Sequence, residues 1–216
     1  NNLMADSGAV YVFRRTASVW TQEAYLKASN TNAGDWFGMA ISLSADGRSV
    51  AVGARNEASS ARGVGANQLD NSAPGAGAVY LFRHTGTAWA QEVFIKAPNA
   101  DAGDYFGWTV GLSAGDVLAV GAYRESSGSR VVNGDLSSNT SSMSGAAYVF
   151  RRTAGAWRHD SFLKAANADA GDLFGWNLSL SDDGRTVVVS AIDEDSGSTT
   201  APAGNGVPTS GAVYVF

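Results

Sequence analysis

Large apolar residues alternate with small or polar ones in short stretches along the chain. In the segment 106–113, every second residue is large and apolar, namely Phe106, Trp108, Val110 and Leu112. A period of two is typical of a β-strand, because successive side chains point to opposite faces. The segments 37–44 and 174–181 repeat the pattern. No stretch shows a helical period, so the pattern predicts an all-β protein.

The strand-like segments belong to a tandem repeat. A hexapeptide close to Gly-Ala-Val-Tyr-Val-Phe begins at residues 8, 77, 145 and 211, with spacings of 69, 68 and 66 residues. A Phe-Gly pair recurs in the same phase at 37–38, 106–107 and 174–175. Each repeat contains four strand-like segments: the first at 37–44, 106–113 and 174–181, the second at 49–54, 117–122 and 186–191, the third at 8–13, 77–82, 145–150 and 211–216, and the fourth at 22–28, 91–97 and 160–166.

Four antiparallel strands per repeat predict the blades of a β-propeller. A β-solenoid is the alternative, but its repeats are shorter. The expected organisation is one propeller segment over 1–216, consisting of a partial blade at 1–28, blades at 37–97 and 106–165, and a partial blade at 174–216. Propellers close with about four to eight blades, so we expect an incomplete ring. Its unpaired strand edges would pair with other copies of the chain or with further repeats of a longer chain.

The succession of Phe-Gly, Val-Gly-Ala and Gly-Ala-Val-Tyr-Val-Phe resembles the FG-GAP repeat, the blade of integrin α-chain propellers. The phrasing Trp-x-x-Glu, Leu-Lys-Ala and Gly-Asp-x-Phe-Gly is closer to the bacterial branch of that family. The resemblance implies blades around an axis in a secreted or cell-surface protein that binds or adheres. The integrin-type calcium loop between the first two strands is missing, because Ser44–Ser49 and its equivalents hold too few carboxylates for a calcium ion, and a turn is expected there.

The charge balance argues against several classes of partner. The net charge is −5, and the three lysines recur at one repeat position, Lys27, Lys96 and Lys164. This distribution provides no row of basic side chains that could follow a phosphate backbone, so nucleic-acid binding is not expected. No apolar run approaches the length of a membrane span, and no membrane insertion is expected. The absence of cysteine excludes disulfides and thiolate metal sites.

A regular polar cluster precedes each Phe-Gly pair and is a candidate calcium site. Oxygens at its first, third and sixth positions could converge on a hard cation. The alternative is a turn in which these side chains satisfy backbone amides. The candidate ligands are Asn30, Asn32 and Asp35, then Asn99, Asp101 and Asp104, then Asn167, Asp169 and Asp172.

The long polar loop between the second and third strands supplies candidate ligand-binding residues. It should emerge on the same face as the Asn/Asp clusters, and this face could bind a cation, a glycan or a protein. The candidates are Glu57, Glu125 and Glu194, which recur once per repeat, with Asn67, Asp70, Asn133 and Asp135. Packing within an ordered loop is the alternative role. Trp20, Trp89 and Trp157 are either sugar-stacking platforms or packing residues.

We expect no enzymatic activity, because the acidic residues repeat as a scaffold would repeat them and no nucleophile–base constellation is present. Two functions remain open. One is a surface-binding or adhesion module, and the other is a structural subunit that assembles into a ring or filament by strand complementation between chains.

Overall fold

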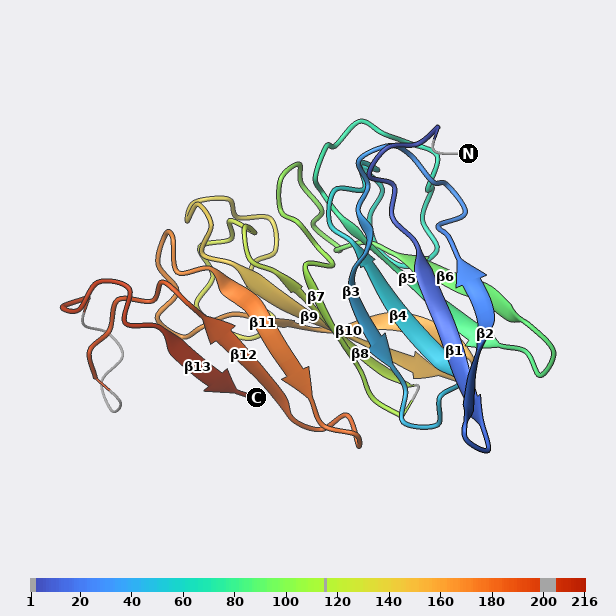
Figure 1. Cartoon of the computed structure of the whole chain (residues 1–216). Coiled ribbons are helices and arrows are strands. Elements are labelled where there is room, and N and C mark those ends of the chain that lie inside the picture. The colour runs from blue at the N-terminus through green and yellow to red at the C-terminus, as the bar shows by residue number, and fades with distance from the viewer. Residues whose placement is uncertain (1–2, 115, 199–204) are drawn as a thin grey trace.

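The computed structural model describes residues 3–114, 116–198 and 205–216, and its regular elements are thirteen β-strands without a helix in these ranges (Figure 1). The strands form four antiparallel sheets that do not close into a ring within the described residues. The prediction of an all-β, incomplete propeller is therefore confirmed.

Each complete repeat is a meander in which consecutive strands pair. The first four-stranded sheet contains β3 (Phe37–Leu43), β4 (Ser49–Ala54), β5 (Ala78–His84) and β6 (Trp89–Ile95). The second contains β7 (Thr109–Leu112), β8 (Val117–Ala122), β9 (Ala146–Thr153) and β10 (Ala156–Leu163). β1 (Val10–Thr16) and β2 (Val19–Leu26) form a two-stranded sheet, and β11 (Phe174–Leu180), β12 (Val187–Ala191) and β13 (Ala212–Val215) form a three-stranded one.

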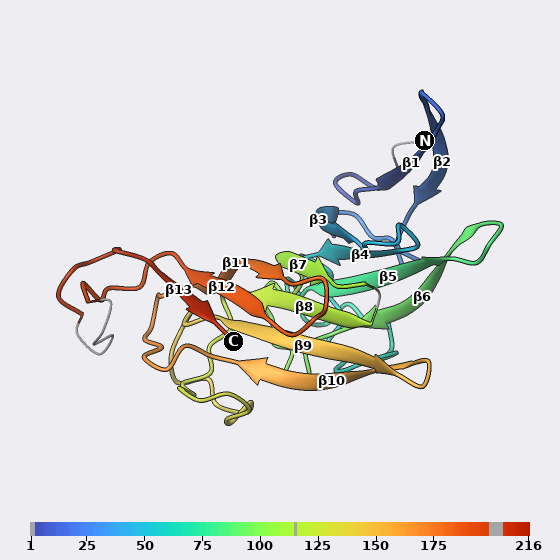
Figure 2. The same ribbon diagram turned by 90° about the horizontal axis from the view of Figure 1, so that it is seen from below.

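The sheets fan out from their first strands. β3, β7 and β11 lie next to one another, and the later strands of each blade lie progressively farther out (Figure 2). The long connections from β4 to β5 and from β8 to β9 gather at one end of the strands, the upper end in Figure 1. The loops that precede β3, β7 and β11 reach the same end, which we call the loop face.

An aromatic trio repeats at the core of each blade. The Phe106 ring lies 5.4 Å from the Tyr148 ring and 6.0 Å from the Phe150 ring, edge to face in both pairs. Phe37 and Phe174 make the equivalent contacts with the Tyr and Phe of their hexapeptides. The Phe of each Phe-Gly pair thus packs on the third strand of its own blade, and these buried edge-to-face pairs stabilise the meander.

The glycine that opens each hexapeptide permits neighbouring blades to touch through their backbones. Gly145 forms a parallel bridge with Phe174 of the next repeat, and its φ is 78°. A Cβ atom on Gly145 would lie 1.9 Å from the Phe174 carbonyl oxygen. Gly77 meets Phe106 in the same way. Glycine is required here for both its left-handed backbone and its missing side chain.

Two strand boundaries differ from the expected ones. β7 begins at Thr109 and not at Phe106, whereas the equivalent strands β3 and β11 begin at Phe37 and Phe174. The third strands continue beyond the hexapeptide, as in β9, which ends at Thr153. The extra residues form a hairpin ribbon with a bulge near Asp160, whose carboxylate pairs with Arg151 at 3.2 Å.

Candidate functional site

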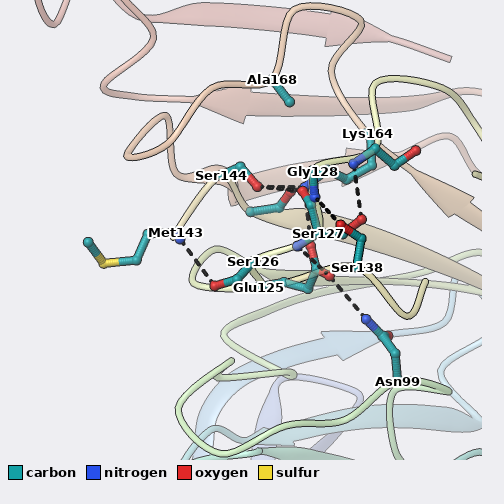
Figure 3. A network of polar contacts seen from close by, with 12 residues as sticks. Asn99, Glu125, Ser126, Ser127, Gly128, Ser138, Met143, Ser144, Lys164 and Ala168 are labelled. Carbon is teal, nitrogen blue, oxygen red and sulfur yellow. Dashed lines mark hydrogen bonds and ion pairs between the residues drawn. The ribbon is translucent and has the colours of Figure 1, made fainter. Parts of the chain in front are cut away.

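A buried polar network lies beneath the loop face in each complete blade. In the second blade, Lys164 Nζ donates to Glu125 Oε2 at 3.1 Å, and Asn99 Nδ2 donates to Glu125 Oε1 at 3.0 Å. The Tyr148 hydroxyl donates to Asn99 Oδ1 at 2.7 Å. Figure 3 shows Asn99 and Lys164 approaching the Glu125 loop from different segments of the chain. The network ties the loop before the first strand, the long loop, the third strand and the end of the fourth strand together.

The first complete blade contains the same network. Lys96 Nζ donates to Glu57 Oε2 at 2.8 Å, Asn30 Nδ2 donates to Glu57 Oε1 at 3.1 Å, and the Tyr80 hydroxyl donates to Asn30 Oδ1 at 2.6 Å. In the third repeat, Asn167 donates to Glu194 and accepts from Tyr214, at 2.6 and 2.7 Å. The recurring Glu, Asn, Tyr and Lys are therefore one unit, which we call the Asn–Glu–Tyr–Lys network.

Burial governs the ionisation of these groups. The side chains of Glu57 and Glu125 are fully buried, and Glu194 is 2% exposed. Burial raises the pKa of Glu57 and Glu125 and lowers the pKa of Lys96 and Lys164, and the ion pairs oppose both shifts. The three glutamates predicted to bind a ligand point into the protein, where their carboxylates already have partners. Their place beside the Asn-containing loops is as expected, and ligand binding by these buried glutamates stays a prediction.

The other predicted ligand residues order the long loops. Asp70 accepts the backbone N–H and the hydroxyl of Ser60 at 2.7 and 2.5 Å, and these bonds lower its pKa to about 2. Asn67 and Asp135 accept backbone N–H groups two residues further along. Asn133 Oδ1 accepts from Phe162 N at 2.8 Å, so this loop covers the free edge of β10.

The sixth position of each candidate calcium loop closes a turn. Asp35, Asp104 and Asp172 are buried, and each accepts the backbone N–H of the residue three positions earlier, at 2.9, 3.0 and 2.7 Å. Burial raises the pKa of Asp104 to about 7 and that of Asp172 to about 6. Buried carboxylates that cap a turn explain why Asp recurs here.

The first and third positions have different partners. Asn30, Asn99 and Asn167 belong to the Asn–Glu–Tyr–Lys network. Asp101 pairs with Arg62 at 3.1 Å and Asp169 pairs with Arg130, while Asn32 donates to Asn71 at 3.3 Å. The described residues contain no group of three or more His, Cys, Asp or Glu side chains arranged to hold a metal ion. Calcium binding by these loops stays a prediction.

Aromatic rings and two arginines gather on the loop face where the first strands of adjacent blades meet. The Arg55 guanidinium carbon lies 4.3 Å from the centre of the Trp36 ring and 5.0 Å from that of Trp108. The centre of the Tyr123 ring lies 4.7 Å from the ring centres of both Trp108 and Trp176. We call this set the aromatic–arginine cluster: Trp36, Arg55, Tyr105, Trp108, Tyr123, Arg124 and Trp176.

The cluster is partly exposed and locally strained. Trp36 is 40% exposed, and the other members are half-buried. Trp36 and Tyr105 both have a φ of 58°, a conformation that non-glycine residues rarely adopt. Arg55 Nε is buried and has no hydrogen-bond partner among the described residues. Leu173, at the same position of the third repeat, has a φ of 57°, so this conformation belongs to the turn before each Phe-Gly pair. The unsatisfied guanidinium nitrogen of Arg55 is the feature that marks the cluster as a candidate site.

A cleft of about 520 Å³ adjoins the cluster at Tyr105. It lies between consecutive repeats and is lined by side chains that include Asn32, Asp35, Asn56 and Asn71. The cleft contributes amide groups, and the adjoining cluster contributes aromatic rings and guanidinium groups. Concave sites that combine apolar walls with a few polar groups are typical of ligand binding.

Sequence reasoning did not single out the aromatic–arginine cluster. Its signal is positional, since Trp36 and Tyr105 directly precede a Phe-Gly pair and Trp108 and Trp176 directly follow one. The tryptophans proposed as sugar-stacking platforms or packing residues lie elsewhere. Trp157 is buried, Trp89 donates to Glu23 of the preceding hairpin at 3.1 Å, and Trp20 is exposed.

The blades are four-stranded meanders whose first strands lie next to one another, and their long loops lie on one face. This arrangement defines a propeller-type binding scaffold. The FG-GAP repeat model matches residues 20–82, 89–150 and 157–216, and the chain belongs to the FG-GAP repeat family. A comparison with curated proteins gave no match. In the described residues, no helix has the length and apolar character needed to cross a membrane.

Proposed function

We propose that the protein is a non-enzymatic binding module of the extracellular space or cell surface that recognises an acidic glycan at the aromatic–arginine cluster. The observation that carries the proposal is the stacking of Arg55 on the exposed Trp36 ring and of Arg124 on the half-buried Tyr105 ring on the loop face. Aromatic rings stack on the apolar faces of sugars, and a guanidinium fork matches a carboxylate. FG-GAP repeats, which are typical of extracellular and surface proteins, support the proposed location and an adhesive role.

The adjoining cleft supports a polyhydroxylated ligand. Its side chains include the amides of Asn56 and Asn71, which both donate and accept hydrogen bonds, as sugar hydroxyls do. The protein as a whole is acidic, with a net charge of −5, whereas the two arginines of the cluster place positive charge at this site. Such a local positive patch selects for anionic groups on the ligand.

The test is calorimetric titration with a uronic-acid oligosaccharide and with a neutral oligosaccharide of the same length. Binding of the acidic sugar should weaken at least tenfold, about 1.4 kcal/mol, in Arg55→Met and in Trp36→Ala. Trp20→Ala is the matched control, because Trp20 is an exposed tryptophan on the β1–β2 hairpin, away from the loop face. Equal affinity for the two sugars, or an equal loss in Trp20→Ala, would contradict the proposal. If the protein bound only a protein ligand at the aromatic–arginine cluster, the site would stand, but its ligand would not be a glycan.

A second candidate function is that of a structural subunit. The half-covered strands at the two ends of the fan favour it, and they lead to the inference below.

A further inference from the structure

The third strand of a blade is covered on both faces only in the complete blades. In β5, Val79, Tyr80, Leu81 and Phe82 are all buried, although their side chains alternate between the two faces. β1 and β13 carry the same hexapeptide, but each is covered on one face only. Val10 of β1 is 7% exposed, whereas the equivalent Val213 of β13 is 66% exposed.

The opposite faces are the exposed ones in β1 and β13. Tyr11 and Phe13 of β1 are exposed, whereas the equivalent Tyr214 and Phe216 pack against the Phe174 core. β1 is therefore covered only on the face that carries Val10, and β13 is covered only on the face that carries Tyr214 and Phe216. One strand with both sets of neighbours would be buried like β5 and β9.

The polar network is divided between the same two ends. Glu194 is buried and bonded to Asn167, but no lysine reaches it within the described residues. Lys27 occupies the lysine position of the network, but no carboxylate pairs with it in the part of the chain that the structure describes. It donates to Ser7 Oγ at 2.8 Å and to the Gly8 carbonyl, as Lys164 donates to Ser144 Oγ and the Gly145 carbonyl, and only the carboxylate of the network is missing among the described residues. Of the three lysines in the sequence, Lys96 and Lys164 are already paired with Glu57 and Glu125, which leaves Lys27 to pair with Glu194 of another copy.

The first strands show the same division. Val110 and Leu112 of β7 are buried against the preceding blade, where Ala40 and Ala51 face them. The equivalent Ile41 and Leu43 of β3 are exposed. On β11, the small polar residues Asn177 and Ser179 are exposed on the side that would face such a strand.

We propose that the hairpin of β1 and β2 from a second copy completes the blade that begins with β11 and β12, with β1 taking the place of β13. The composite blade then contains β11 and β12 of one copy followed by β1 and β2 of the other. Lys27 meets Glu194, the Tyr11 hydroxyl meets Asn167, and β11 covers Ile41 and Leu43. β13 is the strand that yields, since it pairs only with β12, whereas β1 brings β2 with it.

The register of the composite blade follows from the existing one. Val188 pairs with Val215, and Val215 occupies the hexapeptide position of Val12. Val188 should therefore lie opposite Val12 of the second copy. Paired Cα atoms in an antiparallel sheet are close enough for a disulfide, and the natural chain has no cysteine to interfere.

Cysteine pairs provide the direct test. Under mild oxidation, the double variant Val12→Cys/Val188→Cys should form disulfide-linked dimers or larger rings on a non-reducing gel. The matched control Val188→Cys/Val215→Cys should close a disulfide within one chain, hold β13 in place and give monomers. Free thiols in the first variant, or dimers of equal amount in the second, would overturn the exchange of β13.

The ion pair provides an independent test. By light scattering over a concentration series, the unmodified chain should exceed the 22.3 kDa of one copy, and Lys27→Met should weaken association about tenfold. Arg14→Met removes an exposed cation from the same hairpin and should leave association unchanged. Circular dichroism checks that both variants fold. A monomer at all concentrations, which is expected if further repeats of a longer chain complete the blade, would overturn the proposal.

Discussion

Asp104 shows how a single buried carboxyl couples the fold to pH. Its carboxylate caps a turn by accepting the Asp101 N–H at 3.0 Å, and burial raises its pKa from 3.8 to about 7. The folded protein therefore holds this proton more tightly than the unfolded chain does. The resulting contribution to stability is complete below about pH 4 and is lost as the pH rises through about 7.

Asp104→Asn should flatten this dependence. Between pH 5 and pH 8, the free energy of unfolding should fall less in the variant than in the unmodified protein, by roughly 2 kcal/mol. The amide oxygen of asparagine can still accept the Asp101 N–H. Denaturant unfolding at the two pH values is the measurement. Asp70→Asn is the control, because a carboxyl with a pKa of about 2 is ionised throughout this range in both states. A decline of unchanged size in Asp104→Asn would show that other groups carry the pH dependence.

At the scale of the element, the glycine at the start of each hexapeptide sets the distance between blades. Gly145 and Gly155 have nearly the same φ, 78° and 80°, but only Gly145 touches another backbone. Substitution by alanine therefore separates the cost of the backbone conformation from the cost of the contact. The conformation alone costs about 1–2 kcal/mol.

Gly145→Ala should destabilise the protein far more than Gly155→Ala. The added Cβ of the first would lie 1.9 Å from the Phe174 carbonyl oxygen, whereas nothing lies within 4 Å of the second. We expect a loss of about 1 kcal/mol for Gly155→Ala and at least twice that for Gly145→Ala, measured by chemical denaturation. Similar losses in both would mean that the blades can move apart at this junction.

The strands and their order could be predicted from the sequence because they depend on local patterns. Alternation in 106–113 and the repeated hexapeptide determine which residues pair and pack, apart from the bulge near Asp160 and the later start of β7. The role of Glu125 could not be predicted in this way. Its carboxylate is buried because Lys164, 39 residues away, and Asn99, 26 residues away, reach it in the folded blade. The aromatic–arginine cluster was missed for the same reason, since its members come from three repeats.

At the scale of the whole molecule, stability should follow the coverage of the strands. β8 and β9 are buried and lie within a complete blade that has a neighbour on each side, whereas β1 and β13 lie in incomplete sheets at the two ends of the fan. Backbone amides open locally where few apolar contacts hold the strand, so the ends of the fan should exchange hydrogen first.

Hydrogen exchange followed by mass spectrometry can test this gradient and the proposed assembly in one experiment. In dilute protein, peptides from β8 and β9 should exchange most slowly, and those from β1 and β13 most rapidly. At higher concentration, β1 should gain protection as it joins β12 of a second copy, while β13 should lose protection because it is displaced. Added protection in both strands would instead indicate association without exchange. A gradient that is independent of concentration would mean that the open blade has no partner in solution, although its interior strands remain the most stable part of the fold.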